Sequence, residues 1–239
     1  MAKKYTIVLC LSLFFGIIHA GSFTDSRKIY SVVEDDGHRM ISGFQGFNSS
    51  DEVILANAMK WAIEQFCNDQ RDGLFEIQVN KKDFSFYMPL DYVVDGKTKY
   101  SFYCKGNIKV AEGKLVFMIY DIQYKANSLV PLSSTSSIDK LTPEKKPKHK
   151  EIITAFQELA SKKLNQLFDA VEENQCKEIT HWKEIDIQKP VKGMNEDECL
   201  LAFGKPKNIY EDNNNRIQWS YGLNFVLIFE NKILQTIIE

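Results

Sequence analysis

The side chains that could do chemistry are few in this sequence and lie far apart. Beyond residue 20 the histidines are His38, His149 and His181. None of them falls in an H-x-x-x-H pattern, and no C-x-x-C pair presets a metal site. The sequence also contains no G-x-S-x-G elbow, no P-loop and no G-x-G-x-x-G segment. It therefore predicts no catalytic residues, no cofactor-binding residues and no metal site.

The acidic pairs that stand out are chain neighbours. Asp35 precedes Asp36, and Glu172 precedes Glu173. A glycosidase needs two carboxylates that face each other across the scissile bond. Adjacent carboxylates on a turn or a helix point in different directions, so these pairs indicate solvated surface.

Four cysteines follow residue 20, namely Cys67, Cys104, Cys176 and Cys199. In an exported chain they can oxidise, and their positions favour the pairs 67–104 and 176–199 among three possible connectivities. The alternative is that they are unpaired and fill the core. A nucleophilic role is disfavoured, because a cysteine nucleophile needs a nearby base and the histidines are distant.

The first 20 residues have the pattern of a secretory signal peptide. Lys3 and Lys4 precede an apolar run over residues 5–18, which is shorter than the roughly 20 residues of a membrane-spanning helix. We expect cleavage after Ala20, with a cut after Ser22 as the alternative. Cys10 follows a leucine rather than a small residue, so no lipid attachment is expected there. The sequence thus predicts an exported protein, periplasmic or extracellular, without a transmembrane helix in its mature part.

The charge balance after cleavage is weakly acidic. Two of the 30 basic side chains lie in the signal segment, so 28 remain against 32 acidic ones, a formal charge of −4. This balance argues against nucleic acid as a partner. One basic cluster covers residues 145–150 and lies beside Pro143 and Pro147. We interpret it as part of a solvated linker rather than as a contact for an anionic surface.

Residues 24–175 predict an α+β domain with the order β-α-ββββ-α. Apolar residues at helical spacing follow Ser49 and Ser50, either of which can cap a helix, and recur again over residues 153–171. Asp95-Gly96 and Glu112-Gly113 mark tight hairpin turns. Serines, prolines and lysines over residues 128–150 predict a flexible loop. The expected strands cover residues 28–34, 74–80, 83–92, 100–110 and 114–124, and an aromatic-glycine stretch covers residues 43–47.

Two neighbouring strands in this domain are rich in aromatic residues on both alternating faces. These residues are Phe84, Phe86, Tyr87, Tyr92, Tyr100, Phe102 and Tyr103. One face must pack against helices. The other could bind a peptide, a glycan or a protein, or it could be covered by the second domain.

Residues 176–239 predict a small second domain. Asn195 and Glu198 have the spacing of a capping box at a helix start, and Gly204 with Pro206 ends that helix. Three β-rich runs follow over residues 216–221, 224–230 and 232–238, which is typical of an antiparallel meander. About 219 mature residues fit two domains of ordinary size.

The helix start Gly193-Met194-Asn195, the Gly204-Lys205-Pro206 stop and the Trp219-Ser220-Tyr221 strand resemble a BamE/SmpA-like domain, an architecture also found in secreted β-lactamase inhibitors. The resemblance implies protein binding rather than catalysis. The segment over residues 107–122, with the helix around Trp61, looks like an uncharacterised domain of secreted Gram-negative proteins with a TATA-binding-protein-like (TBP-like) fold. That resemblance implies no activity, and a fold name does not imply DNA binding.

Together these patterns predict an exported, non-enzymatic envelope protein that binds or organises another protein or an outer-membrane component. Two alternatives stay open. A hydrolase would bring His38 or His181 against carboxylates in a cleft, and a secreted inhibitor would insert a loop into the cleft of an enzyme.

Overall fold

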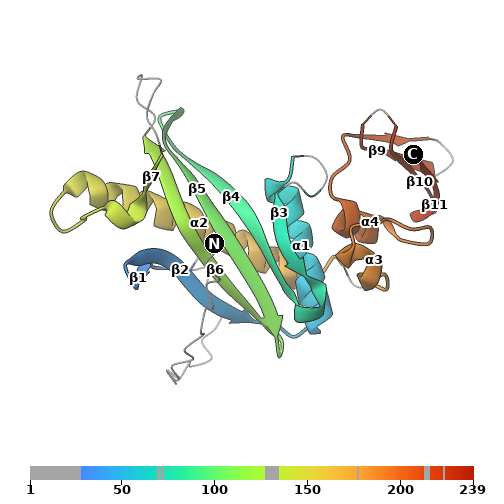
Figure 1. The fold of residues 1–239 in the computed structure, drawn as a ribbon, viewed down its shortest axis with the longest axis horizontal. Coiled ribbons are helices and arrows are strands. Elements are labelled where there is room, and N and C mark those ends of the chain that lie inside the picture. Colours follow the sequence, from blue (N-terminus) through green and yellow to red (C-terminus); the bar gives the residue numbers. More distant parts are fainter. Residues whose placement is uncertain are drawn as a thin grey trace, which may run out of the picture.

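Alternating apolar and polar residues dominate residues 83–126, and these residues form the long strands of an antiparallel sheet (Figure 1). In the part of the chain that the structure describes, this sheet has seven strands in the order β1-β2-β6-β5-β4-β3, with β7 paired to β6. The strands are β1 (Val33–Asp35), β2 (His38–Gly46), β3 (Leu74–Gln78), β4 (Asp83–Val94), β5 (Lys97–Ala111), β6 (Lys114–Ala126) and β7 (Ser136–Ser137).

The computed structural model describes residues 28–68, 71, 73–126, 135–176, 178–212, 216–222 and 224–239. The expected signal peptide over residues 1–20 and both cleavage positions, Ala20 and Ser22, lie outside the described residues. No helix within those ranges is both long enough and apolar enough to cross a membrane.

Two-residue turns with positive φ set the sheet register. Asp95 and Gly96 have φ of 50° and 71°, and Glu112 and Gly113 have φ of 54° and 70°. Positive φ at both central residues gives a turn whose twist matches that of the adjoining strands. The hairpin turns expected at these two acidic-glycine pairs are therefore confirmed.

A third turn of this kind was not expected from the sequence. Asp36 and Gly37, with φ of 47° and 76°, join β1 to β2. Of the single strand expected over residues 28–34, only residues 33–34 lie in a strand, β1, and the chain then turns into β2. Most of the aromatic-glycine stretch lies within β2, which pairs with β6.

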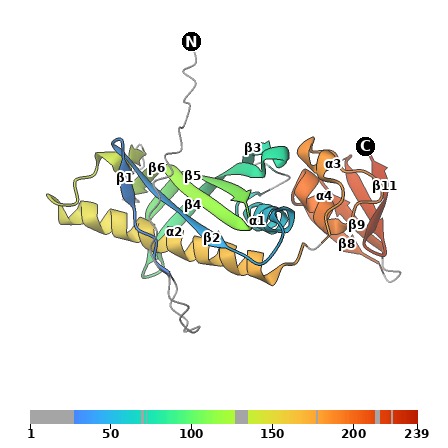
Figure 2. The same ribbon diagram turned by 90° about the horizontal axis from the view of Figure 1, so that it is seen from below.

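Two helices cover one face of the large sheet (Figure 2). Helix α1 (Asp51–Phe66) begins at Ser50, whose hydroxyl accepts from the Val53 N–H as expected. Helix α2 (Pro147–Glu173) begins six residues earlier than the sequence pattern predicted. Proline is well suited to the first helical position, where its missing N–H has no intrahelical partner anyway.

The flexible loop expected over residues 128–150 is wrong for most of its length, because the chain has regular structure there. β7, the 3₁₀ helix η2 (Ile138–Lys140) and the first turn of α2 occupy much of residues 136–150. Ile138 and Leu141 are buried against the core, which anchors this segment. Residues 128–134 of the expected loop lie outside the described residues.

Glycines on the inner face of the sheet make room for phenylalanine rings. A Cβ built on Gly106 would lie 2.3 Å from Cζ of Phe86, its cross-strand partner. A Cβ on Gly43 would lie 2.8 Å from Cζ of Phe117, again its partner in the register. The rings therefore lie directly over glycine backbone beneath the helices.

In its described residues, the C-terminal domain has two short helices and a four-stranded antiparallel sheet in the order β11-β10-β9-β8. The capping box of Asn195 and Glu198 is present, and Gly204 has a φ of 88° at the helix end. Helix α3 and the outermost strand β8 were not expected. The elements are α3 (Trp182–Asp186), α4 (Glu196–Phe203), β8 (Asn208–Glu211), β9 (Arg216–Ser220), β10 (Val226–Glu230) and β11 (Ile233–Ile238).

The parts of the chain that carry the two sheets share one hydrophobic core, and polar contacts also link α1 and the loop after it to α3 and α4. Lys60 forms a salt bridge with Asp197, 2.8 Å between Nζ and Oδ1. Nη1 of the buried Arg71 donates to the carbonyl oxygens of Ile185 and Ala202, at 2.8 and 3.0 Å. These carbonyls lie in the last turns of α3 and α4, and the Ile185 carbonyl also accepts from the Gln188 N–H at 3.2 Å. Arg71 thus caps both helices from the other domain.

The disulfide pairs expected at 67–104 and 176–199 are wrong. Cys67, Cys104, Cys176 and Cys199 are present as thiols, and all four are buried. Cys104 Sγ instead donates to the carbonyl oxygen of Met88 on the neighbouring strand at 3.2 Å. The sulfurs fill space in the core, as buried cysteines commonly do.

Candidate functional site

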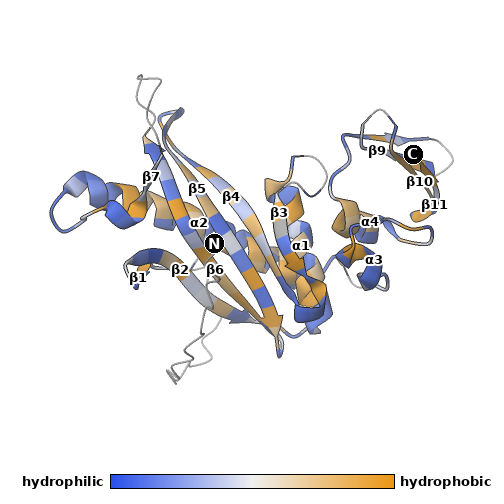
Figure 3. Cartoon of the chain, in the orientation of Figure 1, coloured by the Kyte–Doolittle hydropathy of each residue, from blue (hydrophilic) through white to orange (hydrophobic). Residues whose placement is uncertain are grey.

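The outer face of the large sheet carries large apolar side chains that the helices do not cover. Hydrophobic and hydrophilic residues alternate along β5 and β6 (Figure 3), and α1 and α2 lie on the opposite face (Figure 2). Four exposed side chains point outward, and we term them the sheet patch. They are Phe44, Tyr87, Tyr103 and Val116, with exposed fractions from 40% to 59%.

The strand register joins one half of the sheet patch into a continuous surface. Phe44 of β2 lies opposite Val116 of β6. Met118 and Tyr120 continue the same face of β6, because side chains two residues apart on a strand point the same way. Both are partly exposed. The apolar surface therefore runs along β6 from Val116 towards the middle of the sheet.

The other half of the sheet patch lies across β5 and β4. Lys105 of β5 is paired with Tyr120 on one side and with Tyr87 on the other. Tyr103 precedes Lys105 by two residues on the same face. Three tyrosines thus surround one lysine, and the patch extends diagonally from β2 to β4.

The lysine among these tyrosines forms an ion pair with a carboxylate of the same sheet. Lys105 Nζ lies 3.0 Å from Asp121 Oδ2, and this hydrogen bond raises the pKa of Lys105. Asp121 has a φ of 51° at an irregularity in the β5–β6 register, which directs its carboxylate to the outer face. Burial raises the pKa of Tyr120. The centre of the patch therefore combines tyrosine side chains with one internal ion pair.

The seven aromatic residues singled out in the sequence divide between the two faces. Phe84, Phe86, Tyr100 and Phe102 are buried under the helices. Tyr87 and Tyr103 are about half exposed, and Tyr92 is partly buried. The second domain contacts α1 at the edge of the fold rather than the outer sheet face (Figure 1). Four of the seven residues therefore belong to the core, and Tyr87 and Tyr103 lie on an open surface.

His181 meets a carboxylate, but the arrangement differs from that of a hydrolase. Nδ1 of His181 lies 3.0 Å from both Glu198 Oε1 and Thr180 Oγ1. In a hydrolase triad, one ring nitrogen of the histidine bonds to the carboxylate and the other faces the nucleophile. In His181 the carboxylate and the hydroxyl are instead both near Nδ1. Glu198 also accepts from the backbone N–H groups of Thr180, His181 and Asn195. These contacts assign Glu198 to the start of α4 as a structural group.

The remaining histidines also have local structural partners. His38 Nδ1 lies 3.1 Å from Asp139 Oδ2, and the His38 side chain is 74% exposed. Asp139 in turn accepts from the backbone N–H of Arg39, so this contact ties β2 to η2. His149 Nδ1 accepts from the Thr142 N–H ahead of α2. Within the described ranges, no three histidine, cysteine, aspartate or glutamate side chains are grouped as metal ligands would be.

Comparison with solved structures shows which fold the N-terminal domain has. The chain is similar to a TBP-like protein from Parabacteroides distasonis ATCC 8503, with a TM-score of 0.50 and 14% identity over 60% of this chain and 99% of that one. A DUF4468 family protein from Bacteroides ovatus ATCC 8483 gives a TM-score of 0.46 and 13% identity over 67% of this chain and 99% of that one. The N-terminal domain has a TBP-like fold. No family model matches the chain. No curated protein matches it either.

Half of the sheet patch was missed by sequence analysis. Phe44 lay in a stretch that was not recognised as a strand, and Val116 was one residue in an alternating run. Only the pairing of β2 with β6 places them side by side. The signal in the sequence was the alternation itself, which assigns Val116, Met118 and Tyr120 to one face but does not say which face is covered.

Proposed function

We propose that this protein binds another protein through the sheet patch. The observation that carries the proposal is the exposure of Phe44, Tyr87, Tyr103 and Val116 on a sheet face that the described residues leave uncovered. Contiguous apolar surface on a soluble domain costs free energy unless a partner covers it. Tyrosine is enriched at interface hot spots, because it gives a large contact area and loses little side-chain entropy.

The charge around the sheet patch favours a protein surface over a polyanion. Lys105, the lysine at its centre, is paired with Asp121. Lys114 lies at its rim, with Nζ 5.9 Å from the centroid of the Phe44 ring. Because Asp121 pairs with Lys105 inside the patch, the lysine at its centre is not free to bind a polyanion.

The C-terminal domain offers a second contact of the same kind, which fits the resemblance to BamE-like domains. β8 is an outer strand of the small sheet, and its Ile209 and Tyr210 are 59% and 58% exposed. An edge strand has free backbone groups to which another chain can add a strand. We therefore propose β8 as a supporting contact in an exported, non-enzymatic envelope protein whose signal peptide covers residues 1–20.

Site-specific photo-crosslinking tests the proposal. A photoreactive phenylalanine analogue replaces Tyr103 in the sheet patch, Tyr210 in β8, or Lys162 on the exposed side of α2 as the control position. Irradiation of intact cells should give a defined protein adduct from position 103. A comparable adduct from position 210 alone would move the contact to the C-terminal domain. Equal adducts from positions 103 and 162 would contradict a specific sheet surface.

A further inference from the structure

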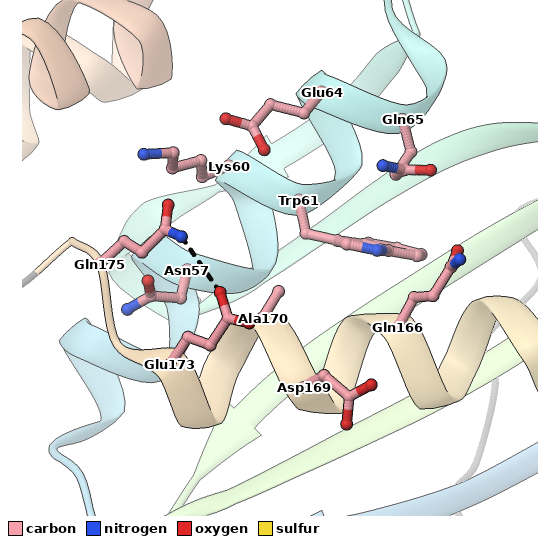
Figure 4. Close-up of a pocket in the computed structure, with 10 residues that line it drawn as sticks. All are labelled: Asn57, Lys60, Trp61, Glu64, Gln65, Gln166, Asp169, Ala170, Glu173 and Gln175. Atoms are coloured by element: carbon pink, nitrogen blue, oxygen red, sulfur yellow. Dashed lines mark hydrogen bonds between the residues drawn. The ribbon is translucent and has the colours of Figure 1, made fainter. Parts of the chain in front are cut away.

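A pocket lies between α1 and α2, and polar groups in its wall are held by internal contacts (Figure 4). Gln175 Nε2 donates to Glu173 Oε2 at 3.1 Å, the bond drawn in Figure 4. Lys60 Nζ, in the same wall, is paired with Asp197 of the C-terminal domain at 2.8 Å. These polar groups therefore have partners within the chain. The small sheet of the C-terminal domain, by contrast, has an edge whose backbone groups are open.

The two edges of the small sheet differ. At the β11 edge, the Gly193 N–H donates to the Leu234 carbonyl oxygen at 2.9 Å, and the Leu234 N–H donates to the Met194 carbonyl oxygen at 2.8 Å. The segment before α4 therefore closes that edge. β8 forms the other edge, and among the described strands it pairs only with β9. All of its residues are exposed, so the described part of the chain leaves its outer side open.

The hydrogen bonds between β8 and β9 show which backbone groups of β8 face outward. Asp212, one residue beyond β8, donates its N–H to a carbonyl oxygen of β9 at 3.0 Å. In an antiparallel pair of strands, residues that bond to the neighbour alternate with residues whose N–H and C=O point away. Tyr210 therefore bonds to β9 as Asp212 does, and Ile209 and Glu211 direct their backbone N–H and C=O groups outward.

We propose that β8 pairs with β8 of a second copy of this chain, antiparallel and around a twofold axis that passes between the two Tyr210 residues. In this register Ile209 of one copy lies opposite Glu211 of the other. The outward N–H and C=O groups of both residues then find their partners in the other copy, because the two residues of each pair exchange both bonds. The pairing joins two four-stranded sheets into one continuous sheet.

The two neighbouring symmetric registers fit less well. An axis at Ile209 would place Glu211 opposite Lys207. The Lys207 N–H is already bonded to the Ser220 carbonyl oxygen at 2.7 Å, so it does not complete that pair. An axis at Glu211 would place two carboxylates directly opposite each other, which is destabilising. The axis at Tyr210 instead brings together two phenol rings that are each 58% exposed in the single chain, and opposed aromatic pairs stabilise antiparallel strands.

A second copy at β8 rests on the supporting role proposed above for that strand and names its occupant. The sheet patch lies on the N-terminal domain, so the two contacts can be measured separately. Self-association of the purified chain requires no other protein, whereas binding at the sheet patch does.

Sedimentation of the purified mature protein tests the pairing. The sedimenting mass should rise from that of a monomer towards that of a dimer over about a hundredfold range of concentration, because the copies associate by mass action. The Tyr87→Ser and Tyr103→Ser variant should dimerise as the unaltered chain does. A chain that stays monomeric up to about 1 mM would overturn the proposal and leave the sheet patch untouched. Loss of the dimer in the sheet-patch variant would also overturn it.

Single added cysteines locate the axis. Tyr210→Cys places two thiols at a directly opposed pair with Cα atoms about 4.5 Å apart, within reach of a disulfide. Asn208→Cys is the matched control on the same face of β8, and its two thiols would lie four residues apart along the strands, roughly 13 Å. Under mild oxidation Tyr210→Cys should give about tenfold more disulfide-linked dimer than Asn208→Cys. Equal yields, or a larger yield from Asn208→Cys, would overturn the proposed pairing.

Discussion

The guanidinium of Arg71 donates from Nη1 to the carbonyl oxygen of Ala202 over 3.0 Å, and this bond crosses from the N-terminal domain into the last turn of α4. The same nitrogen reaches the Ile185 carbonyl at the end of α3. Burial lowers the pKa of Arg71 to about 10, which leaves it charged at neutral pH. A positive charge at two helix C-termini is favourable, because the helix dipole is negative there.

Arg71→Met should therefore destabilise the protein and loosen the docking of the C-terminal domain. We expect a loss of about 1–3 kcal/mol in the free energy of unfolding, because the Ala202 carbonyl loses its Arg71 donor and the Ile185 carbonyl loses one of its donors. Urea unfolding measures the loss. Arg216→Met, on an exposed position of β9, is the control and should stay within about 0.5 kcal/mol of the unaltered protein. Equal effects of the two substitutions would contradict the capping role.

Gly106→Ala should be destabilising although glycine is not required by the backbone there. The added Cβ would meet the Phe86 ring at 2.3 Å, and overpacking of this kind costs about 1–3 kcal/mol. Gly46→Ala in β2 is the matched control, because its Cβ would meet no atom within 4 Å. Thermal unfolding compares them. In a protein that already carries Phe86→Leu, Gly106→Ala should lower the melting temperature less than it does in the unaltered protein. An equal loss in both proteins would show that contact with the Phe86 ring is not the cause.

Stability should fall in acid partly through Glu198. Burial alone would raise the pKa of Glu198, but hydrogen bonds from Thr180, Asn195 and His181 lower it below its usual value. A lowered pKa in the folded state contributes stability above the unfolded pKa of about 4.3, and that contribution is lost as pH falls through the folded pKa. Melting curves from pH 7 to pH 3 should show the gap between the unaltered protein and Glu198→Gln narrowing in acid.

The matched control for this pH dependence is Glu158→Gln on the exposed side of α2. Its melting temperature should follow that of the unaltered protein at every pH, because the replaced side chain is exposed. A gap for Glu198→Gln that stays constant or widens in acid would show that Glu198 does not act through its charged form.

The thiols of the folded protein should be unreactive. Burial raises the pKa of Cys176 to about 12, and it raises the pKa values of Cys104 and Cys199 as well. The thiolate is the reactive form, so a disulfide reagent at pH 8 should modify few thiols in the native mature protein and four in denaturant. A count below four in denaturant would show that cysteines pair after export.

Local patterns in the sequence predicted much of the fold. Alternation over residues 83–92, 100–110 and 114–124 predicted three long strands, and the spacing of Asn195 and Glu198 predicted the start of α4. These signals are local, since a strand face or a helix cap is set by residues within a few positions of each other.

Features that depend on distant contacts were missed. β8 is exposed along its whole length and is held by backbone pairing with β9, so it has no apolar alternation to reveal it. The four cysteines are buried as separate thiols, which spacing along the chain does not show. The sheet patch likewise depends on the pairing of β2 with β6, more than 60 residues apart in the chain.

The sheet patch is the central claim, and a paired comparison of variants tests it most directly. The mature protein, a Tyr87→Ser and Tyr103→Ser variant, and an Ile209→Ser and Tyr210→Ser variant are each tagged and used to capture the crosslinked partner from intact cells. Both variants should keep their stability within about 0.5 kcal/mol per substitution, because the replaced side chains are exposed. The account predicts that the sheet variant loses the partner and that the β8 variant retains most of it. Full capture by the sheet variant would contradict the account.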